Sequence, residues 1–550
     1  MEVHKYRHEV LDKYMSEIGS RVVAESGIPS DRYHFGKLVL QGLKSDPDFL
    51  MQIDGGTGES ETNASGLRRS IRCASCFKKL GLKVGDVIIL MGANNIDQAI
   101  PFYAALFEGI ITSGIDRTLG VNELKGVFSN NKPKLIFCQG DKVQDAKKAL
   151  ELAGGEGRVI SYDRSPDTIS FSDMLEKYGE DVDVQKYRAA DFDSEETIAL
   201  IVSTSGSTGL PKSAMLTHKN ITLSTPFFGC FGTKFPRVTK SGLVLSPIQW
   251  GSALLHYLLA PVFQYTRIQS SKELTTDHII ELINKYKPTF LTTSPPLMIS
   301  LLQESETKPC DFSGFDAILL SGSAVPDHVM PILRSRAPNT KLGNAYGMSE
   351  FAGIVFYPFG APNGSSGKAA AHVQHKLMNV ETGEEVKEPH KAGELWVKPP
   401  GGFKGYYNHP ADTAAAVTAD GWCKSGDLFY RDENWNYFFV DRLKLLLKYR
   451  NHQISPVELE AVIYKLPGVA NVAVSGVPDA ECGELPVAFV VPRPGADITE
   501  KDVEDIVKEN LTDSKLLRGG VVFVTSLPAL PSTKIDRRKI KLMAKELAKK

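Results

Sequence analysis

The sequence predicts an α/β protein with a large N-terminal domain and a small α+β C-terminal domain. Its 550 residues exceed the roughly 100–200 residues of an ordinary domain, so we expect two or more domains. Hydrophobic residues make up 42% and charged residues 23% of the chain, which is typical of folded globular proteins. Short apolar runs alternate with amphipathic segments through most of the chain, and this order is typical of βαβ units in largely parallel sheets.

Short apolar runs mark the expected strands of the N-terminal part. Amphipathic segments between them predict helices at Asp145–Ala153 and His278–Tyr286. The runs are apolar throughout, which indicates strands covered by helices. These strands are expected at Val87–Met91, Leu135–Cys138, Ile198–Val202, Thr289–Thr292 and Ala317–Leu320.

The residue pattern of the sequence changes from about Gly393. Aromatic and β-branched residues alternate there with Gly and Pro, as they do in small antiparallel sheets. A compact α+β pattern follows Lys444, so we predict an N-terminal domain at 1–440, a hinge at 441–444 and a lid domain at 445–550. The elements expected in the lid are a helix at Pro456–Leu466, strands at Val469–Val477 and Val487–Val491, a helix at Lys501–Leu511 and a strand at Val521–Val524.

Charge and hydropathy exclude several classes of protein. The 64 Lys and Arg residues nearly cancel the 65 Asp and Glu residues, so the chain lacks the basic footprint of a nucleic-acid-binding protein. The longest apolar stretch, Gly251–Tyr265, is interrupted by His256 and Pro261 and is shorter than the ~20 residues of a membrane span. The terminal Ala548-Lys549-Lys550 differs from the peroxisomal SKL signal, so a cytoplasmic location is expected rather than a peroxisomal one.

The most informative segment is STSGSTGLPK, at Ser203–Lys212, directly after an expected strand. Its hydroxyls, glycines and lysine can wrap and neutralise a polyphosphate. The segment nearly matches the Walker pattern G-x-x-x-x-G-K-(S/T), but Pro211 occupies the second glycine position and removes an N–H donor. The sequence therefore predicts a phosphate loop of another kind, with a flexible Ser/Gly linker as the alternative.

This segment resembles the signature loop of the adenylate-forming enzymes, which include acyl- and aryl-CoA synthetases, adenylation domains and firefly luciferase. The loop's core in that family is (S/T)-(S/G)-G-(S/T)-T-G-x-P-K. The overall texture is closest to the branch of luciferase and 4-coumarate–CoA ligase. Five further blocks that resemble the family follow in the expected order: Ser321–Ala324, Asn344–Glu350, Gly421–Asp427, Asp441–Lys444 through Glu460, and Pro531–Arg538.

The resemblance implies a fold and a chemistry. The fold would be a large N-terminal domain of two α/β subdomains plus a small β-barrel, with a mobile C-terminal lid. The substrate carboxylate would attack the α-phosphate of ATP, with Mg²⁺ bound, and form acyl-AMP and pyrophosphate. A thiol, usually that of CoA, or an oxidant would then attack the mixed anhydride.

The resemblance also assigns the nucleotide site. Ser349 would touch the α-phosphate, Asp427 would accept both ribose hydroxyls, and Arg442 would bind the ribose or phosphate side. The base pocket would be formed by Gly322, Ser323, Ala324, Asn344, Tyr346 and Gly347, with Tyr346 stacked on the adenine. The β- and γ-phosphates would be held by Thr204, Ser205, Gly206, Ser207, Thr208, Gly209 and Lys212.

Lys534 is the leading catalytic candidate, together with Lys212. The family pattern places Lys534 over the α-phosphate during adenylation, and Lys448 would replace it when the lid rotates for the second half-reaction. Glu350, with Thr208, would hold Mg²⁺, a cation that prefers oxygen ligands. Without the resemblance, a lysine and a glutamate at such positions would be ordinary surface residues.

The acid pocket differs from that of beetle luciferases. Gln249, Trp250 and Gly251 follow Pro247-Ile248, and Trp250 stands where the second histidine of the luciferases lies. Ser224 and Ile354 align with an arginine and an alanine of the beetle pocket, so a fatty or aryl acid without a matching charge is expected. Asn451 and Thr533 replace family glycines, which leaves the efficiency of the CoA step open.

Three hypotheses follow. The leading one is an AMP-forming acyl-CoA ligase that uses ATP, Mg²⁺ and CoA and acts on a medium- to long-chain fatty or aryl acid. The second is a luciferase-type monooxygenase that oxidises an adenylated luciferin with O₂ and emits light. The third is a weakly catalytic protein that binds an acyl-adenylate. The sequence leaves the oligomeric state open, and a monomer is compatible with each hypothesis.

Overall fold

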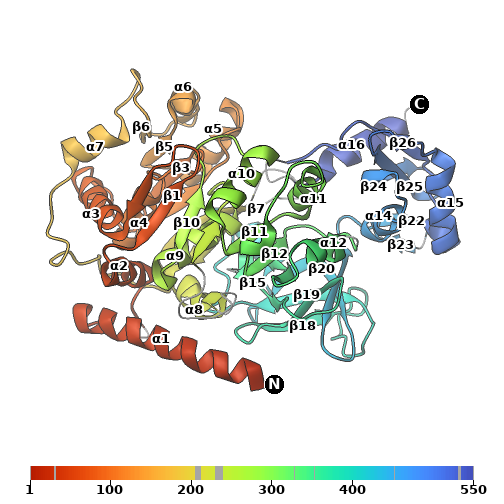
Figure 1. Ribbon diagram of the computed structural model, residues 1–550, viewed down its shortest axis with the longest axis horizontal. Coiled ribbons are helices and arrows are strands. Elements are labelled where there is room, and N and C mark those ends of the chain that lie inside the picture. The colour runs from red at the N-terminus through yellow and green to blue at the C-terminus, as the bar shows by residue number, and fades with distance from the viewer. Residues whose placement is uncertain are drawn as a thin grey trace.

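The computed structural model describes residues 2–29, 32–204, 212–229, 240–327, 329–351, 353–450, 452–530 and 534–548. In the described residues a large N-terminal body carries three large sheets and one two-stranded sheet, and a smaller C-terminal domain lies beside it (Figure 1). The predicted α/β fold class, with a large N-terminal and a small C-terminal domain, is confirmed. The N-terminal helix α1 (Glu2–Ser26) runs along α2 (Phe35–Ser45) and α8 (His218–Gly229).

The first sheet has the strand order β6-β5-β3-β4-β7-β8 and is parallel except for its edge strand β8. Side chains of β3 alternate between two apolar layers: Ile88 and Leu90 pack toward α3 and α4, whereas Ile89 and Met91 pack toward α5 and α6. This double burial explains the uninterrupted apolar runs in the sequence. The elements are α3 (Asn63–Lys79), β3 (Val87–Met91), α4 (Ala99–Glu108), β4 (Ile111–Gly114), α5 (Val121–Asn131), β5 (Leu135–Cys138), α6 (Val143–Leu152), β6 (Arg158–Ser161), α7 (Phe171–Tyr178), β7 (Ile198–Thr204) and β8 (Lys212–Thr217).

The second sheet has the order β13-β12-β11-β9-β10-β1-β2 and is parallel except for β2. Helices α10, α11 and α12 cover one face through a shared apolar cluster. The expected strands and helices lie within two residues of their predicted limits in both sheets. The elements are β1 (Leu50–Asp54), β2 (Ser60–Thr62), β9 (Ser241–Leu243), α9 (Gly251–Phe263), β10 (Thr266–Gln269), α10 (Thr276–Tyr286), β11 (Phe290–Thr293), α11 (Pro295–Glu304), β12 (Ala317–Ser321), α12 (Val329–Arg336) and β13 (Lys341–Ala345).

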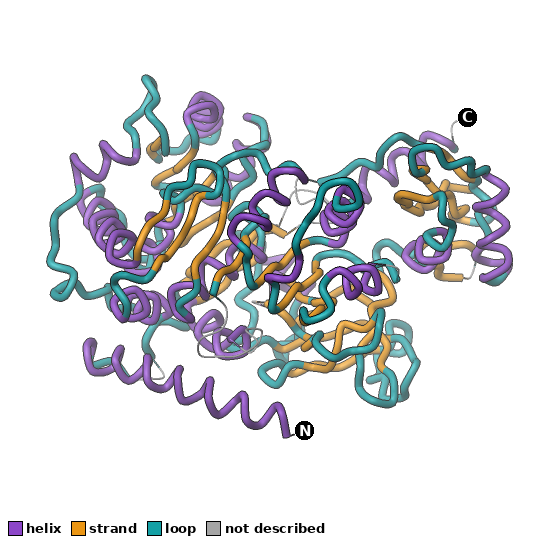
Figure 2. Tube along the Cα trace, in the orientation of Figure 1, coloured by secondary structure: helices purple, strands orange, loops and turns teal. Residues whose placement is uncertain are grey.

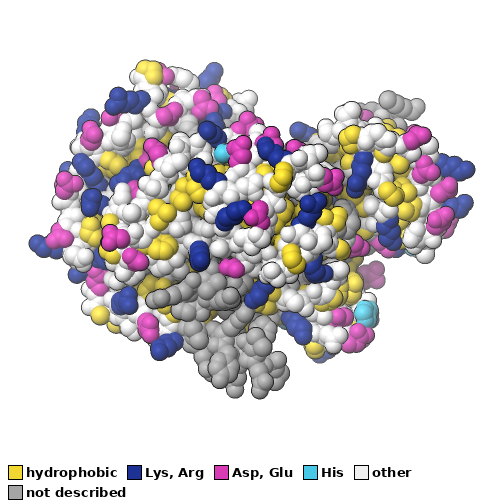
Figure 3. Space-filling model, in the orientation of Figure 1, with side chains coloured by type: hydrophobic (Ala, Val, Ile, Leu, Met, Phe, Trp, Pro, Cys, Tyr) yellow, Lys and Arg dark blue, Asp and Glu magenta, His cyan; other side chains and the backbone are white. Residues whose placement is uncertain are grey.

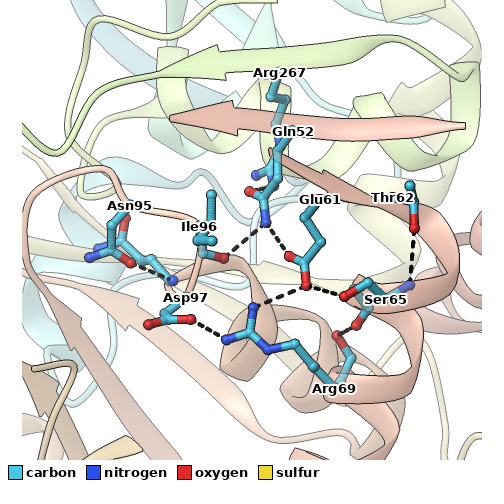
Figure 4. Close-up of polar contacts among 12 residues, drawn as sticks. Gln52, Glu61, Thr62, Ser65, Arg69, Asn95, Ile96, Asp97 and Arg267 are labelled. Atoms are coloured by element: carbon cyan, nitrogen blue, oxygen red, sulfur yellow. Dashed lines mark hydrogen bonds and ion pairs between the residues drawn. The ribbon is translucent and has the colours of Figure 1, made fainter. Parts of the chain in front are cut away.

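A buried polar network joins the edge of the second sheet to the loop after β3 (Figure 4). Arg267 of β10 is fully buried, lies 4.1 Å from the ring centre of Tyr257 and donates to Gln52 at 2.7 Å. Gln52 in turn donates to Glu61 at 2.7 Å, and Glu61 also accepts from Arg69 at 3.0 Å. The amide of Gln52 therefore connects a buried cation to a buried anion, which a low-dielectric interior requires.

The third sheet is antiparallel, in the order β16-β17-β21-β20-β19-β18. It corresponds to the expected small barrel, although its edge strands β16 and β18 are not paired with each other in the described residues. Its apolar face shares a core with the second sheet, because Ala317 and Leu319 of β12 pack in the same cluster as Phe429. The elements are β16 (Phe356–Tyr357), β17 (Ser365–Ala369), β18 (Gln374–Met378), β19 (Gly393–Lys398), α13 (Pro410–Ala416), β20 (Cys423–Arg431) and β21 (Tyr437–Arg442). Just before them, β14 (Gly347–Met348) and β15 (Gly353–Ile354) form a separate two-stranded antiparallel sheet.

The C-terminal domain has its own sheet and its own apolar core. The predicted helices and strands are confirmed, whereas the hairpin of β22 and β23 and the last helix were not anticipated. Its elements are β22 (Leu447–Tyr449), β23 (His452–Ile454), α14 (Pro456–Ile463), β24 (Val469–Asp479), β25 (Gly483–Pro492), α15 (Glu500–Asn510), β26 (Val521–Phe523) and α16 (Arg537–Leu547). Single 3-10 turns occur at Gly140–Lys142, Phe312–Gly314, Ser349–Phe351 and Asp513–Lys515.

The connection between the two domains runs from Arg442, the last residue of β21, to Leu447, the first residue of β22. The buried carboxylate of Asp441 accepts from the Ser455 hydroxyl and from the backbone N–H of Val457 at 3.3 Å. Asp441 thereby ties the end of the third sheet to the first turn of α14.

The tube view shows the strands gathered into separate layers of the body and the C-terminal domain (Figure 2). Acidic and basic side chains are interspersed on the face shown in Figure 3, which also has a notch between the body and the C-terminal domain. Within the described residues, the helices are too short or too polar to cross a bilayer.

Candidate active site

The predicted phosphate loop connects two hydrogen-bonded strands. Thr204, the last residue of β7, is the antiparallel partner of Lys212, the first residue of β8. A Walker loop leads from a strand into a helix, so this strand-loop-strand arrangement agrees with the different loop inferred from Pro211. The loop itself, with Ser205, Gly206, Ser207, Thr208 and Gly209, lies outside the described residues, as does the side chain of Thr204.

A tyrosine connects the predicted phosphate-binding lysine to the predicted metal ligand. The ammonium of Lys212 pairs with Asp412 of α13 and lies 5.2 Å from the ring centre of Tyr406. The Tyr406 hydroxyl donates to the Glu350 carboxylate at 2.7 Å. Burial raises the pKa of Glu350, and the hydrogen bond from Tyr406 opposes this shift.

Tyr406 is a residue that the sequence analysis did not single out. It is held against β8, because the backbone N–H of Met215 donates to Gly405 at 3.0 Å and Ala214 pairs with Tyr406. Gly405 has a φ of +100°, and a Cβ there would lie 2.4 Å from the Thr413 side chain, so glycine is required. The Gly-Tyr pair before α13 was the signal in the sequence.

Asp427 is the centre of a second buried group. Its carboxylate is 1% exposed and lies on β20 directly opposite Arg442 of β21, whose Nε is 3.1 Å from Oδ1. The Tyr346 hydroxyl donates to Oδ2 at 2.7 Å. Burial raises the pKa of Asp427, and the charge of Arg442 opposes this shift. A carboxylate has about four acceptor positions, so two remain for further donors such as a ribose diol.

Two neighbouring parallel strands deliver the residues predicted for the base pocket. Ser321 of β12 pairs with Ala345 of β13, so Gly322 and Tyr346 leave the second sheet at the same edge. Ligands of α/β proteins bind at this carboxyl edge. Ser323 and Ala324 follow Gly322, while Asn344 lies in β13 and Gly347, Ser349 and Glu350 follow in β14 and the next 3-10 turn.

Lys534 of the C-terminal domain reaches this edge. A Cβ built on Gly322 would lie 2.6 Å from the Lys534 ε-carbon, and Gly322 has a φ of +95°. The ammonium of Lys534 lies 5.8 Å from the ring centre of Trp250. Burial, with the charge of Arg442, lowers the pKa of Lys534 to about 8, and Asp427 opposes this shift.

The C-terminal domain holds Lys534 through the start of α16. The Lys534 carbonyl accepts from the Leu530 N–H at 2.7 Å, and the Asp536 side chain caps α16. Arg537 makes a two-pronged ion pair with Glu460 of α14, one branch of which is 2.8 Å. In Figure 1 the start of α16 extends from the C-terminal domain toward the body.

Two known protein families match the sequence over regions that contribute most of these residues. Residues 43–407 match the family of AMP-binding enzymes, and residues 458–534 match the C-terminal domain of AMP-binding enzymes. The chain belongs to this adenylate-forming family. The predicted resemblance is therefore confirmed.

Curated relatives and solved structures of the family cover nearly the whole chain. The luciferin 4-monooxygenase of Nipponoluciola cruciata is 30% identical over 90% of this chain and 91% of its own length. The 4-coumarate–CoA ligase 4 of Arabidopsis thaliana is 28% identical over 95% and 93%. The fold of ATP-bound MatB from Rhodopseudomonas palustris superposes with a TM-score of 0.83 at 23% identity, covering 94% of this chain and all of that one.

In this member of the adenylate-forming family, only one of the two lysines predicted to act from the lid lies at the candidate site. Lys534 lies at the site, whereas Lys448 is exposed on β22 and its backbone N–H donates to Glu484 at 3.0 Å. Within the described part of the chain, the Lys448 ammonium makes no ion pair or hydrogen bond.

Three of the four residues predicted for the acid pocket lie at the start of α9. Gln249 is buried, and its backbone is fixed by Gly114 of β4, where a Cβ would lie 2.8 Å from the Gln249 Cα. Trp250 precedes α9, and its indole N–H has no partner among the described residues. Gly251 begins α9 and is exposed. Ile354 lies elsewhere in the sequence, in β15 opposite Gly347.

The donor set fits Mg²⁺ bound together with a nucleotide. The described residues contain no cluster of three or more His, Cys, Asp or Glu side chains that could hold a metal by themselves. Mg²⁺ usually binds through one or two carboxylates and the phosphates of its substrate. The buried carboxylate of Glu350, next to the Lys212 side of the phosphate loop, meets this requirement.

Proposed function

We propose that the protein is an AMP-forming acyl-CoA ligase that uses ATP, Mg²⁺ and CoA. The observation that carries the proposal is the position of Lys534: a lid cation lies against Gly322, beside Trp250, and within electrostatic reach of Asp427. These residues come from the lid, the base pocket, the acid pocket and the ribose site. Their convergence is what adenylation of an acid requires.

The nucleotide is held by groups that the fold already fixes. Asp427 accepts the two ribose hydroxyls, and Tyr346, whose hydroxyl is anchored on Asp427, offers its ring to the adenine. Arg442 balances the charge of Asp427. Lys212 and the phosphate loop bind the β- and γ-phosphates, Ser349 contacts the α-phosphate, and Glu350 holds Mg²⁺, which neutralises phosphate charge.

In the first half-reaction an oxygen of the substrate carboxylate attacks the α-phosphorus. A P–O bond forms, the bond to the β-phosphate breaks, and pyrophosphate leaves with its electron pair. Negative charge collects on the α-phosphate oxygens as the phosphorus becomes five-coordinate. The ammonium of Lys534 stabilises this charge, because it is already in place and only partly hydrated.

In the second half-reaction the CoA thiolate attacks the acyl carbon, and AMP departs with the electrons of the acyl–phosphate bond. We propose that the lid pivots at 441–444 and brings Lys448 to the site in place of Lys534. The exposed, unpaired position of the Lys448 ammonium in the described residues is compatible with this exchange.

The acid is proposed to be a medium- to long-chain fatty or aryl acid. Gln249, Trp250 and Ile354 carry no charge, so the pocket favours an uncharged acyl group. The similarity to the 4-coumarate–CoA ligase of Arabidopsis thaliana supports an aryl acid as one candidate substrate.

The test is pyrophosphate release with a panel of fatty and aryl acids, measured with and without CoA. The proposal expects acid-dependent release, a CoA thioester product, and a rate of adenylation ~10²–10³ lower in Lys534→Ala. Lys448→Ala should retain acyl-AMP formation and lose the thioester. A chain that binds ATP but adenylates none of the acids contradicts the proposal and fits a weakly catalytic acyl-adenylate binder.

A second candidate function is a luciferase-type monooxygenase, which the 30% identity to a luciferin 4-monooxygenase favours. Its adenylate would react with O₂ instead of a thiol. Light emission with a luciferin, ATP and O₂, together with no thioester product in the presence of CoA, would identify this activity.

A further inference from the structure

Trp250 lies where the lid lysine arrives. Its ring centre is 5.8 Å from the Lys534 ammonium, within the range over which an aromatic face attracts a cation. The two residues are 284 positions apart in the sequence, since they occupy positions 250 and 534. Because Trp250 belongs to the body and Lys534 to the C-terminal domain, the contact depends on how the two domains pack.

Several groups act on the Lys534 ammonium at this position. The Lys534 side chain lies against Gly322 at the end of β12. The charge of Arg442 repels the ammonium, and the charge of Asp427 attracts it. Asp427 is already paired with Arg442 at 3.1 Å and hydrogen-bonded to Tyr346. Among the described residues, no carboxylate therefore forms a direct ion pair with the Lys534 ammonium. The Trp250 ring adds a second attraction to the electrostatic one of Asp427.

We propose that Trp250 is a positioning residue for adenylation: its ring face holds the Lys534 ammonium in place and keeps it charged. The role deepens the proposed function and rests on it. An aromatic face can do this where a carboxylate would not, because a carboxylate would pair with the lysine and compete with the phosphate for it. Trp250 acts through Lys534 and is distinct from a group that touches the reacting atoms.

The proposal limits the effect of Trp250 to one half-reaction. Lys534 serves the attack on the α-phosphorus, and it leaves the site when the lid turns for thioester formation. Removing the ring should slow acyl-AMP formation by a larger factor than it slows the attack of CoA on a preformed acyl-AMP, because only the first step also loses the support of Lys534. A residue that only shapes the acid pocket would slow both steps by the same factor, because the acyl group occupies the pocket in both.

The experiment compares Trp250→Leu, Trp250→Phe and the parent enzyme. Acyl-AMP formation is followed by pyrophosphate release at saturating acid, and thioester formation is started from synthetic acyl-AMP and CoA. We expect Trp250→Leu to slow the first step by roughly 3- to 30-fold, the range of a partly desolvated cation–π contact. The second step should slow by a clearly smaller factor, which reports the contribution of Trp250 to the acid pocket, and Trp250→Phe should recover most of the first step.

A pH profile adds a readout that a structural role would not move. Loss of the ring should lower the pH above which adenylation fails, and Trp250→Phe should restore it. Trp435→Leu is the matched control, because Trp435 also lies beside a cation, 3.9 Å from Arg431, but is 56% exposed in the turn between β20 and β21.

Equal slowing of both half-reactions, or an unchanged pH profile in Trp250→Leu, overturns the inference. Absence of acyl-AMP formation in the parent enzyme with every acid is a different result, since it contradicts the proposed function itself.

Discussion

The ε-carbon of Lys534 lies 2.6 Å from the point where a side chain on Gly322 would begin. The lid lysine therefore occupies the space that a glycine at the end of β12 leaves open. Gly322 also has a φ of +95°, in which residues with a side chain are strained. A side chain at position 322 would therefore displace the end of the Lys534 side chain.

Gly322→Ala should selectively impair adenylation. The added methyl group cannot share the space with the lysine, and the flexible side chain of Lys534 must retreat from the site. We expect acyl-AMP formation to fall at least about tenfold, in line with a misplaced electrostatic group, while thioester formation from synthetic acyl-AMP changes less. Gly383→Ala controls for backbone strain, because Gly383 has a φ of +72° and open space around it. Equal activity in the two variants would contradict the steric argument.

Adenylation should decline at alkaline pH. Burial lowers the pKa of Lys534 to about 8, and the chemistry needs the protonated form, so kcat/KM should be full below this pH and fall above it. Lys534 binds a proton less tightly when it is buried at the site than when it is exposed to solvent, so rising pH favours the buried position. The loss of activity at alkaline pH therefore comes from deprotonation of Lys534 and not from opening of the lid.

The profile of kcat should fall at a higher pH than that of kcat/KM, because bound triphosphate stabilises the ammonium. Lys534→Arg remains charged and should remove the alkaline decline even if its rate is lower. An alkaline limb that persists unchanged in Lys534→Arg would assign the titration to another group.

Asp412→Asn should lower the KM for ATP. The Asp412 carboxylate pairs with Lys212 and competes with the phosphates for the same ammonium. Both side chains are partly exposed, so the gain is up to about fivefold and should shrink at high salt. Asp513→Asn, which removes an exposed ion pair with Arg518 in the lid, is the control. A raised KM for ATP in Asp412→Asn would show that Asp412 instead orients the lysine.

Gln52→Leu should destabilise the N-terminal body without altering the chemistry. The substitution removes the amide that connects Arg267 to Glu61 and leaves both charges with fewer buried partners (Figure 4). We expect a loss of about 2–4 kcal/mol in the unfolding of this part of the chain. Thermal unfolding followed by tryptophan fluorescence measures it, with the exposed Gln374→Leu as control. An unchanged unfolding temperature in Gln52→Leu would contradict the prediction and would mean that water satisfies Arg267 and Glu61 in place of the amide.

Local chemistry in the sequence was enough to predict the elements that have the clearest patterns. The run VIILM predicted β3 at Val87–Met91, because strands buried on both faces carry no polar alternation. Pro211 indicated that the phosphate loop was not a Walker loop, and the loop indeed joins two strands. Helix α16 was not anticipated, because its pattern follows a Pro-rich loop and is strongly basic.

The sequence by itself determined the family and the strands with the clearest apolar runs, and it predicted the phosphate-loop, ribose and lid residues, since these follow from short-range patterns and motifs. Tertiary structure alone decided that Lys534 meets Gly322 and Trp250, that Asp412 pairs with Lys212, and that Tyr406 joins Glu350. The physical reason is that these contacts join residues from separate elements, in one case from separate domains. Their distances depend on how the sheets and the lid pack, which no local pattern of residues encodes.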